Sequence, residues 1–131
     1  MKQKLLSRME HYFGKDVKRI NHAHRVLKYA EEIIAREGGD PEVIFAAAIL
    51  HDIGIHACER KYDSVAGKYQ EIEGPPIAEN LLSKINFPAD KIPEVLEIIA
   101  HHHRGGIKTQ NFKVIVAADQ KVNCEEANPS I

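Results

Sequence analysis

An unbroken run of eight apolar residues, 43–50, leads directly into His51-Asp52-Ile53-Gly54. A run this apolar predicts a helix that is buried on nearly all sides. An ionised carboxylate at the end of such a helix is costly unless it is paired, hydrogen-bonded or bound to a metal. The chain must therefore fold so that another group compensates Asp52.

The length and composition of the chain predict a single domain over residues 1–131, large enough to bury a core without disulfides or metals for stability. The 18 lysines and arginines balance 19 aspartates and glutamates, so no net field attracts nucleic acid or a membrane surface. Cys58 and Cys124 form no disulfide framework, and neither a signal peptide nor a membrane-length apolar run is evident. We expect a cytoplasmic protein with a small-molecule partner; a homodimer is left open.

Residues that favour helix starts and stops divide most of the chain into helices. Asp16 and Asp40 are good N-caps, and Gly14 and Gly38-Gly39 end helices. Helices are expected over residues 2–13, 16–37, 40–54, 75–85, 90–103 and 112–126. The expected fold is a compact all-α bundle of five to seven helices.

Residues 55–73 are polar and weakly patterned. We expect a functional loop or lid there, with a short helix near residues 65–70. Pro75-Pro76 is expected to start the next helix, because proline is tolerated in a first turn. The loop would lie beside the His51-Asp52 pair.

His22 shares a helical stripe with Val26, Tyr29 and Ile33, which places it on an inward-facing side. Such a histidine is either a hydrogen-bonded core residue or a ligand. Asp119 lies in the apolar stripe of the last expected helix. Its carboxylate needs an ion pair with Arg25 or a lysine, or a bound metal.

Three consecutive histidines, His101-His102-His103, close another expected helix. Imidazoles at a helix C-terminus can interact with the helix dipole, or they can bind a metal. Four separate helices thus carry inward His or Asp residues, and one divalent-metal site would explain all of them. Nitrogen and oxygen donors without a thiolate suit Mn, Fe, Ni, Zn or Mg.

The order of His22-Ala-His-Arg-Val26, His51-Asp52-Ile-Gly54 and a late Asp119 resembles the HD-domain (His-Asp) metal-dependent phosphohydrolase superfamily, HDIG-type. The resemblance covers roughly residues 15–125. It implies an HD-domain-like helical bundle in which His22, His51, Asp52 and Asp119 bind a first metal.

Members of that superfamily with a second metal add paired histidines, which His101 and His102 resemble. Where such members often have a further histidine near residue 74, this chain has Glu73-Gly74, so Glu73 is a candidate carboxylate ligand. The resemblance therefore implies one or two divalent ions. Asp52 would bridge the ions if two bind.

The resemblance also implies a reaction, the hydrolysis of a phosphate ester or anhydride in a nucleotide or another small phosphorylated metabolite. Asp52 and His51 are the expected catalytic residues, with metal-activated water as the nucleophile. A lysine commonly follows the motif in this superfamily, and Ile55 stands there instead. The cations available for a phosphate are Arg25, Lys61, Lys68 and Arg104.

Three alternatives stay open at this point. A domain of this kind can bind a metal or a nucleotide as a sensor or interaction module without turnover. A few members of the fold use iron to carry out oxygenation. Finally, the histidines could serve packing alone in a helical structural domain.

Overall fold

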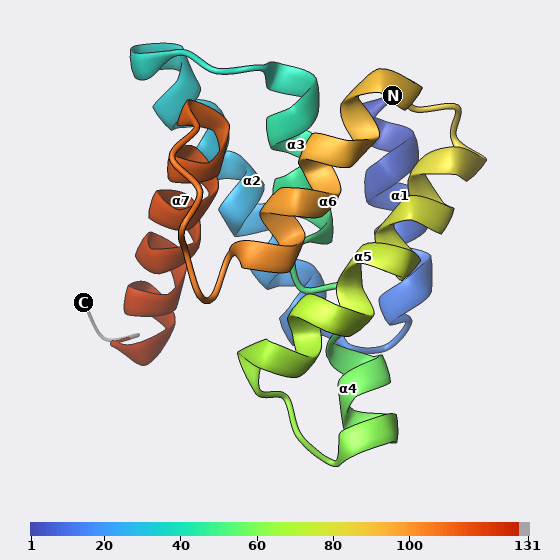
Figure 1. The fold of residues 1–131 in the computed structure, drawn as a ribbon. Helices are drawn as coiled ribbons and strands as arrows, with labels where there is room; N and C mark the ends of the chain where they lie inside the picture. Colours follow the sequence, from blue (N-terminus) through green and yellow to red (C-terminus); the bar gives the residue numbers. More distant parts are fainter. Residues whose placement is uncertain (129–131) are drawn as a thin grey trace.

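The computed structural model describes residues 1–128, which form seven α-helices, one short 3-10 helix and, within that range, no strand (Figure 1). The elements are α1 (Lys2–Phe13), α2 (Val17–Glu37), α3 (Pro41–Leu50), α4 (Ile55–Tyr62), α5 (Gly67–Lys84), η1 (Ala89–Lys91), α6 (Ile92–His101) and α7 (Gln110–Ala127). The expected all-α bundle of five to seven helices is confirmed.

Helix α3 is the central element and contacts α1, α2, α6 and α7 (Figure 1). Every residue from Val43 to Leu50 is buried. The helix begins at the N-cap Asp40, whose side chain accepts hydrogen bonds from the backbone N–H groups of Glu42 and Val43 at 3.0 and 3.4 Å. An apolar helix surrounded by four others is the scaffold that fixes the position of the His51-Asp52 pair.

The stretch Pro41–Tyr62 is long and apolar enough, by length and composition, to cross a membrane. In this structure 78% of its most apolar window is buried inside the protein. That burial fits the core helix of a folded domain. The expected cytoplasmic location stays a prediction.

The expectation of a loop over residues 55–73 is wrong, because α4 and the first turns of α5 cover most of this stretch. Pro75 and Pro76 lie inside α5 and do not start it. Proline in a helix interior costs about 3 kcal/mol, so packing must compensate. One face of α5 is buried on both sides of the prolines, at Gln70, Gly74, Ala78, Leu81 and Leu82.

Two expected helices end earlier than their apolar patterns indicate. Helix α3 stops at Leu50, so residues 51–54 form turns, and α6 stops at His101. In a helix, successive side chains point 100° apart around the axis, whereas in these turns neighbouring polar side chains can point in the same direction. The turns after α3 and α6 are therefore free to face the same region as α2 and α7.

Candidate metal centre

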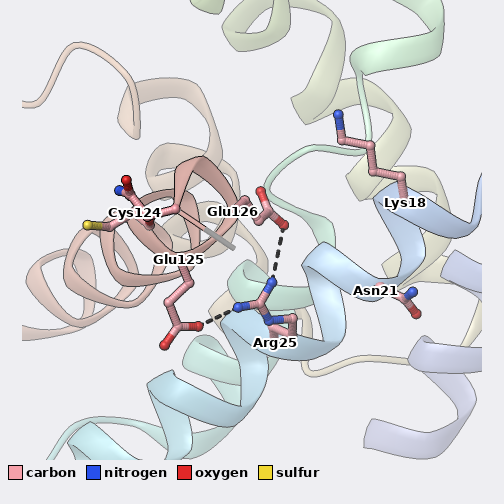
Figure 2. A pocket seen from close by; sticks show the side chains of 7 residues that line it. Lys18, Asn21, Arg25, Cys124, Glu125 and Glu126 are labelled. Carbon is pink, nitrogen blue, oxygen red and sulfur yellow. Dashed lines mark hydrogen bonds and ion pairs between the residues drawn. The ribbon is translucent and has the colours of Figure 1, made fainter. Parts of the chain in front are cut away.

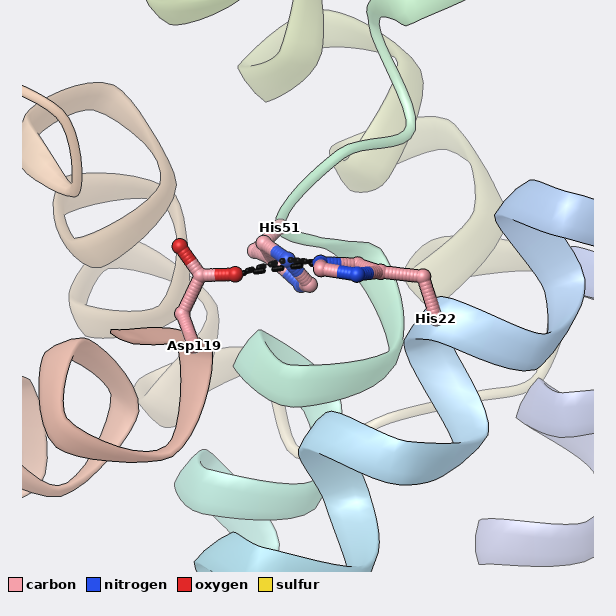
Figure 3. A group of neighbouring side chains, drawn as sticks. All are labelled: His22, His51 and Asp119. Carbon is pink, nitrogen blue, oxygen red and sulfur yellow. Dashed lines mark hydrogen bonds and ion pairs between the residues drawn. The ribbon is translucent and has the colours of Figure 1, made fainter. Parts of the chain in front are cut away.

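Side chains from α2, the turn after α3, and α7 meet at one point inside the bundle (Figure 3). His22 Nε2 lies 3.0 Å from Asp119 Oδ1, and His51 Nε2 lies 3.2 Å from the same oxygen. The two Nε2 atoms of His22 and His51 are 3.2 Å apart. Asp52 Oδ2 completes the group at 3.4 Å from His22 Nε2 and 3.3 Å from His51 Nε2.

These separations match the edges of a coordination polyhedron. Metal–ligand bonds of about 2.0–2.2 Å place neighbouring ligand atoms about 2.8–3.6 Å apart in octahedral or tetrahedral geometry. The five measured distances run from 3.0 to 3.4 Å. These five separations are therefore those expected for ligand atoms around a single ion.

Hydrogen bonds on the far side of both rings determine which nitrogen faces this point. His51 Nδ1 donates to the carbonyl oxygen of Ala48 at 2.7 Å, and His22 Nδ1 donates to the carboxylate of Glu126 at 3.0 Å. In a neutral ring the other nitrogen, Nε2, then carries a lone pair. Two lone pairs and two carboxylates thus face one another, and a divalent cation satisfies all four groups.

The pKa values of His51 and Asp52 in the metal-free protein also show that the site favours positive charge. Burial by itself lowers the pKa of His51, but the carboxylates of Asp52 and Asp119 outweigh it and hold that pKa well above its usual value. Burial raises the pKa of Asp52, yet the neighbouring His51 and His102 bring it well below the usual range. Asp52 is therefore ionised at neutral pH, and protons compete with a metal for the site.

A second group of potential ligands consists of Asp52, His102 and His103. His102 Nδ1 donates to the carbonyl oxygen of Ile99 at 2.8 Å, so its Nε2 carries the lone pair. That Nε2 lies 3.5 Å from Asp52 Oδ1, and it is the only buried side-chain N or O in residues 1–128 without a hydrogen-bond partner. An unsatisfied buried acceptor beside a carboxylate fits a second cation.

Asp52 connects the two groups. Its Oδ2 faces His22 and His51, whereas its Oδ1 faces His102. The side chain is 17% exposed, in contrast to the fully buried His51 side chain. A bridging role for Asp52 is thus compatible with the geometry, and the residue is reachable from solvent.

Two residues considered for the second metal lie elsewhere. His101 belongs to neither group: its Nδ1 donates to Glu97 O at 2.9 Å, and its Nε2 accepts from Arg104 at 3.0 Å. Glu73 also belongs to neither group, since its oxygens accept from Lys61 Nζ and Tyr62 Oη, each at 2.8 Å. His103, which follows the end of α6, takes the place expected for His101.

The cations expected to bind phosphate differ in whether a carboxylate already pairs with them. Arg25 pairs with Glu125 and Glu126, and Lys61 pairs with Glu73. Arg104 Nε lies 3.6 Å from Glu71 Oε1. The side chain of Lys68 lies over the Tyr69 ring, 5.0 Å from its centre, and makes no carboxylate pair within residues 1–128. The ion pair considered between Asp119 and Arg25 does not form.

Two cavities flank the ligand groups. One, of about 760 Å³, lies between α2 and the end of α7, where Arg25 reaches both glutamates (Figure 2). The other, of about 430 Å³, is bordered by Lys68, Arg104 and His103. The second cavity therefore joins two cations to a member of the second ligand group.

Sequence reasoning missed two residues that support the ligands, Glu126 and Gln70, and it did not single out His103 from the run of three histidines. Glu126 follows Asp119 by seven residues, a spacing that puts both on one helix face, so the helical pattern could have indicated it. Gln70 Oε1 accepts a hydrogen bond from His103 Nε2 at 3.2 Å. Gln70 lies at the end of the short helix expected within the loop over residues 55–73, and no pattern there pointed to a role for its side chain.

Comparisons with known proteins agree with this geometry. The family model described as HD domain matches residues 19–128. No curated protein matches the chain. The crystal structure of a predicted HD superfamily hydrolase from an uncultured Thermotogales bacterium superposes with a TM-score of 0.68 at 28% identity, covering 90% of this chain. The chain spans 66% of the length of that protein. From its sequence match and its fold, the chain belongs to the HD domain family.

Proposed function

We propose that this protein is a metal-dependent phosphohydrolase that cleaves a phosphate ester or anhydride in a small phosphorylated metabolite, such as a nucleotide. The observation that carries the proposal is the convergence of two histidine lone pairs and two carboxylates within 3.0 to 3.4 Å. The similar Thermotogales protein is named a predicted hydrolase, which supports hydrolysis as the reaction class. A bound divalent cation supplies Lewis-acid polarisation of a phosphoryl oxygen and lowers the pKa of a water molecule toward neutrality.

Each ligand residue has its own part in this proposal. His22 on α2, His51 in the turn after the buried helix α3, and Asp119 on α7 serve to fix the ion. The Asp52 side chain is 17% exposed, close to the 15% of Asp119, but Asp52 alone also faces His102; it is ionised, so it can accept a hydrogen bond from the attacking water and orient it. His102, with its unpartnered Nε2, is suited to a second ion. The ions proposed are one or two of Mn, Fe, Ni, Zn or Mg.

For the phosphate, the structure favours the side of the site that carries Lys68 and Arg104. Both border the cavity that contains His103, and Lys68 has no carboxylate partner among the described residues. Arg104 Nε lies 3.6 Å from Glu71 Oε1, a looser pair than those that Arg25 and Lys61 form with their glutamates. We propose that a phosphoryl group enters beside His103, where Lys68 and Arg104 balance its charge.

The test is hydrolysis of a panel of phosphomonoesters and nucleotides in the presence of Mn, for the wild type, Asp52→Ala and Glu73→Gln. Glu73→Gln is the matched control, since Glu73 belongs to neither ligand group. We expect metal-dependent turnover that Asp52→Ala abolishes and Glu73→Gln retains. Activity retained in Asp52→Ala, or nucleotide binding without turnover in the wild type, would contradict the proposal.

A further inference from the structure

Gln70 is a buried polar residue in the first turns of α5, only 6% exposed. Its amide nitrogen donates to the carbonyl oxygen of Val65 at 2.7 Å. That bond fixes the orientation of the amide, because a carbonyl can only accept a hydrogen bond. The amide oxygen Oε1 must therefore face the other way, toward His103 Nε2 at 3.2 Å.

The hydrogen bond to Gln70 determines which nitrogen of the His103 ring carries the proton. Since Oε1 is an acceptor, His103 Nε2 must be the N–H donor, and the lone pair of the neutral ring is left on Nδ1. This arrangement is opposite to that of His51 and His102, whose Nδ1 atoms donate to backbone carbonyls. His103 would thus bind an ion through a different nitrogen from the other histidines.

The start of α5 also restrains the ring directly. A Cβ atom on Gly67 would lie 2.7 Å from His103 Cγ and 2.8 Å from its Cβ, so only glycine permits this approach. On another side, the ring centre of His102 is 3.9 Å away. A 180° turn of the His103 ring would exchange Nε2 for a carbon and lose the hydrogen bond to Gln70.

We infer that Gln70 is a positioning residue that selects Nδ1 of His103 as the nitrogen available to a second metal ion beside Asp52 and His102. That selection serves the protein only if the proposed metal-dependent function holds, and to this extent the inference rests on it. The protonation state itself is a property of the metal-free chain. The part played by α5 is then to present His103 in one orientation and one tautomer.

The test is a long-range ¹H–¹⁵N correlation spectrum of the histidine rings in chelator-treated, full-length protein at pH 8, where the His103 ring is neutral because burial lowers its pKa from the usual 6.5. We expect His103 to carry its proton on Nε2 in the wild type. In Gln70→Met, which removes the acceptor, the proton should redistribute between both nitrogens. A wild-type His103 with its proton on Nδ1 would overturn the inference without any variant.

Titration of the same proteins with Zn gives the second readout. Gln70→Met should weaken the second ion about 10- to 100-fold, as for other outer residues that orient a ligand, and leave the first ion unchanged. Ser64→Ala is the matched control, because Ser64 Oγ accepts from Ala66 N in the same turn without touching His103. Equal weakening in both variants would overturn the role of Gln70. If the wild type binds fewer than two ions, the two-metal form of the proposed function fails, and the ring spectrum still decides the tautomer.

Discussion

His22 Nε2 lies 3.2 Å from His51 Nε2, and the Nδ1 atom of each ring donates a hydrogen bond to an oxygen atom on its other side. In neutral rings these two nitrogens would repel each other. Asp119 and Asp52 add negative charge at 3.0 to 3.4 Å from His22 Nε2. When both rings are neutral, the fold therefore holds four electron-rich atoms together, and a cation that replaces the protons between them should contribute directly to stability.

Metal binding is expected to stabilise the protein against heat. An ion that binds only the folded state at 100 times its Kd contributes about 2.7 kcal/mol. For a chain of this length that corresponds to a rise in Tm of roughly 10 °C. Differential scanning fluorimetry of chelator-treated protein, with and without Mn or Zn, measures the shift. His51→Ala should show little or no rise, and an equal rise in that variant would place the binding site elsewhere.

Glu126 is expected to act on the metal through His22. Its carboxylate accepts from His22 Nδ1 at 3.0 Å and so holds Nε2 toward the site. Glu126→Gln should weaken binding of the first ion about 10- to 100-fold. Glu125→Gln is the matched control, because Glu125 accepts from Tyr29 and Arg25 but not from a ligand histidine. Calorimetric titration that found the same loss in both variants would contradict the role of Glu126.

Gly54, the last residue of the His-Asp-Ile-Gly motif, is expected to be required for packing of the motif against α5. A Cβ at Gly54 would lie 2.7 Å from the backbone nitrogen of Gly74, and backbone cannot move aside cheaply. Gly54→Ala should therefore cost about 1–3 kcal/mol of unfolding free energy. The only close contact of a Cβ on Gly74 would be a methyl group of Ile99, at 3.0 Å, and Gly74→Ala gains helix propensity, so its cost should be smaller. Urea unfolding that ranks the two variants in the reverse order would contradict this contact.

The start of α3 should make stability depend on acid pH. Burial raises the pKa of Asp40, but hydrogen bonds from Lys91 and from the N–H groups of Val43 and Glu42 outweigh it and hold the pKa below its ordinary value of 3.8. A carboxyl group with a depressed pKa stabilises the fold above pH 3.8, and this contribution is lost as pH falls through the folded-state pKa.

Asp40→Asn isolates that contribution, because asparagine is an equally good N-cap but does not titrate. At pH 7 the variant should be less stable than the wild type by about 0.2–1 kcal/mol, the range for a partly exposed ion pair. The difference should shrink as pH falls from 4 toward 2. Urea unfolding across this range measures it, and a difference that stays constant would rule out the charge of Asp40 as the cause.

Much of the fold could be predicted because its signals are local. The expected bounds of α1 agree with the structure at both ends, and Asp16 and Asp40 cap α2 and α3 as expected. A helix was expected over residues 75–85, the second part of α5, but its continuity through Pro75 and Pro76 could not be predicted, because both prolines oppose it locally and burial of one face decides it.

The candidate site divides in the same way. His22 and Asp119 lie on inward faces of regular helices, so their approach to the His51-Asp52 pair followed from helical spacing. The choice between His101 and His103 depended on where α6 ends, which the apolar pattern did not reveal. Gln70 acts through a contact with His103, 33 residues away in the chain, and such contacts leave no local signal.

The central claim is that His22, His51, Asp52 and Asp119 hold a divalent metal. Elemental analysis of untagged protein, after incubation with Mn, Fe, Ni, Zn or Mg and removal of free ions, tests it most directly. The wild type should retain at least one ion per chain, and His51→Ala should lose that ion while staying folded by circular dichroism. A folded wild type that retains none of these metals in stoichiometric amount would contradict the claim.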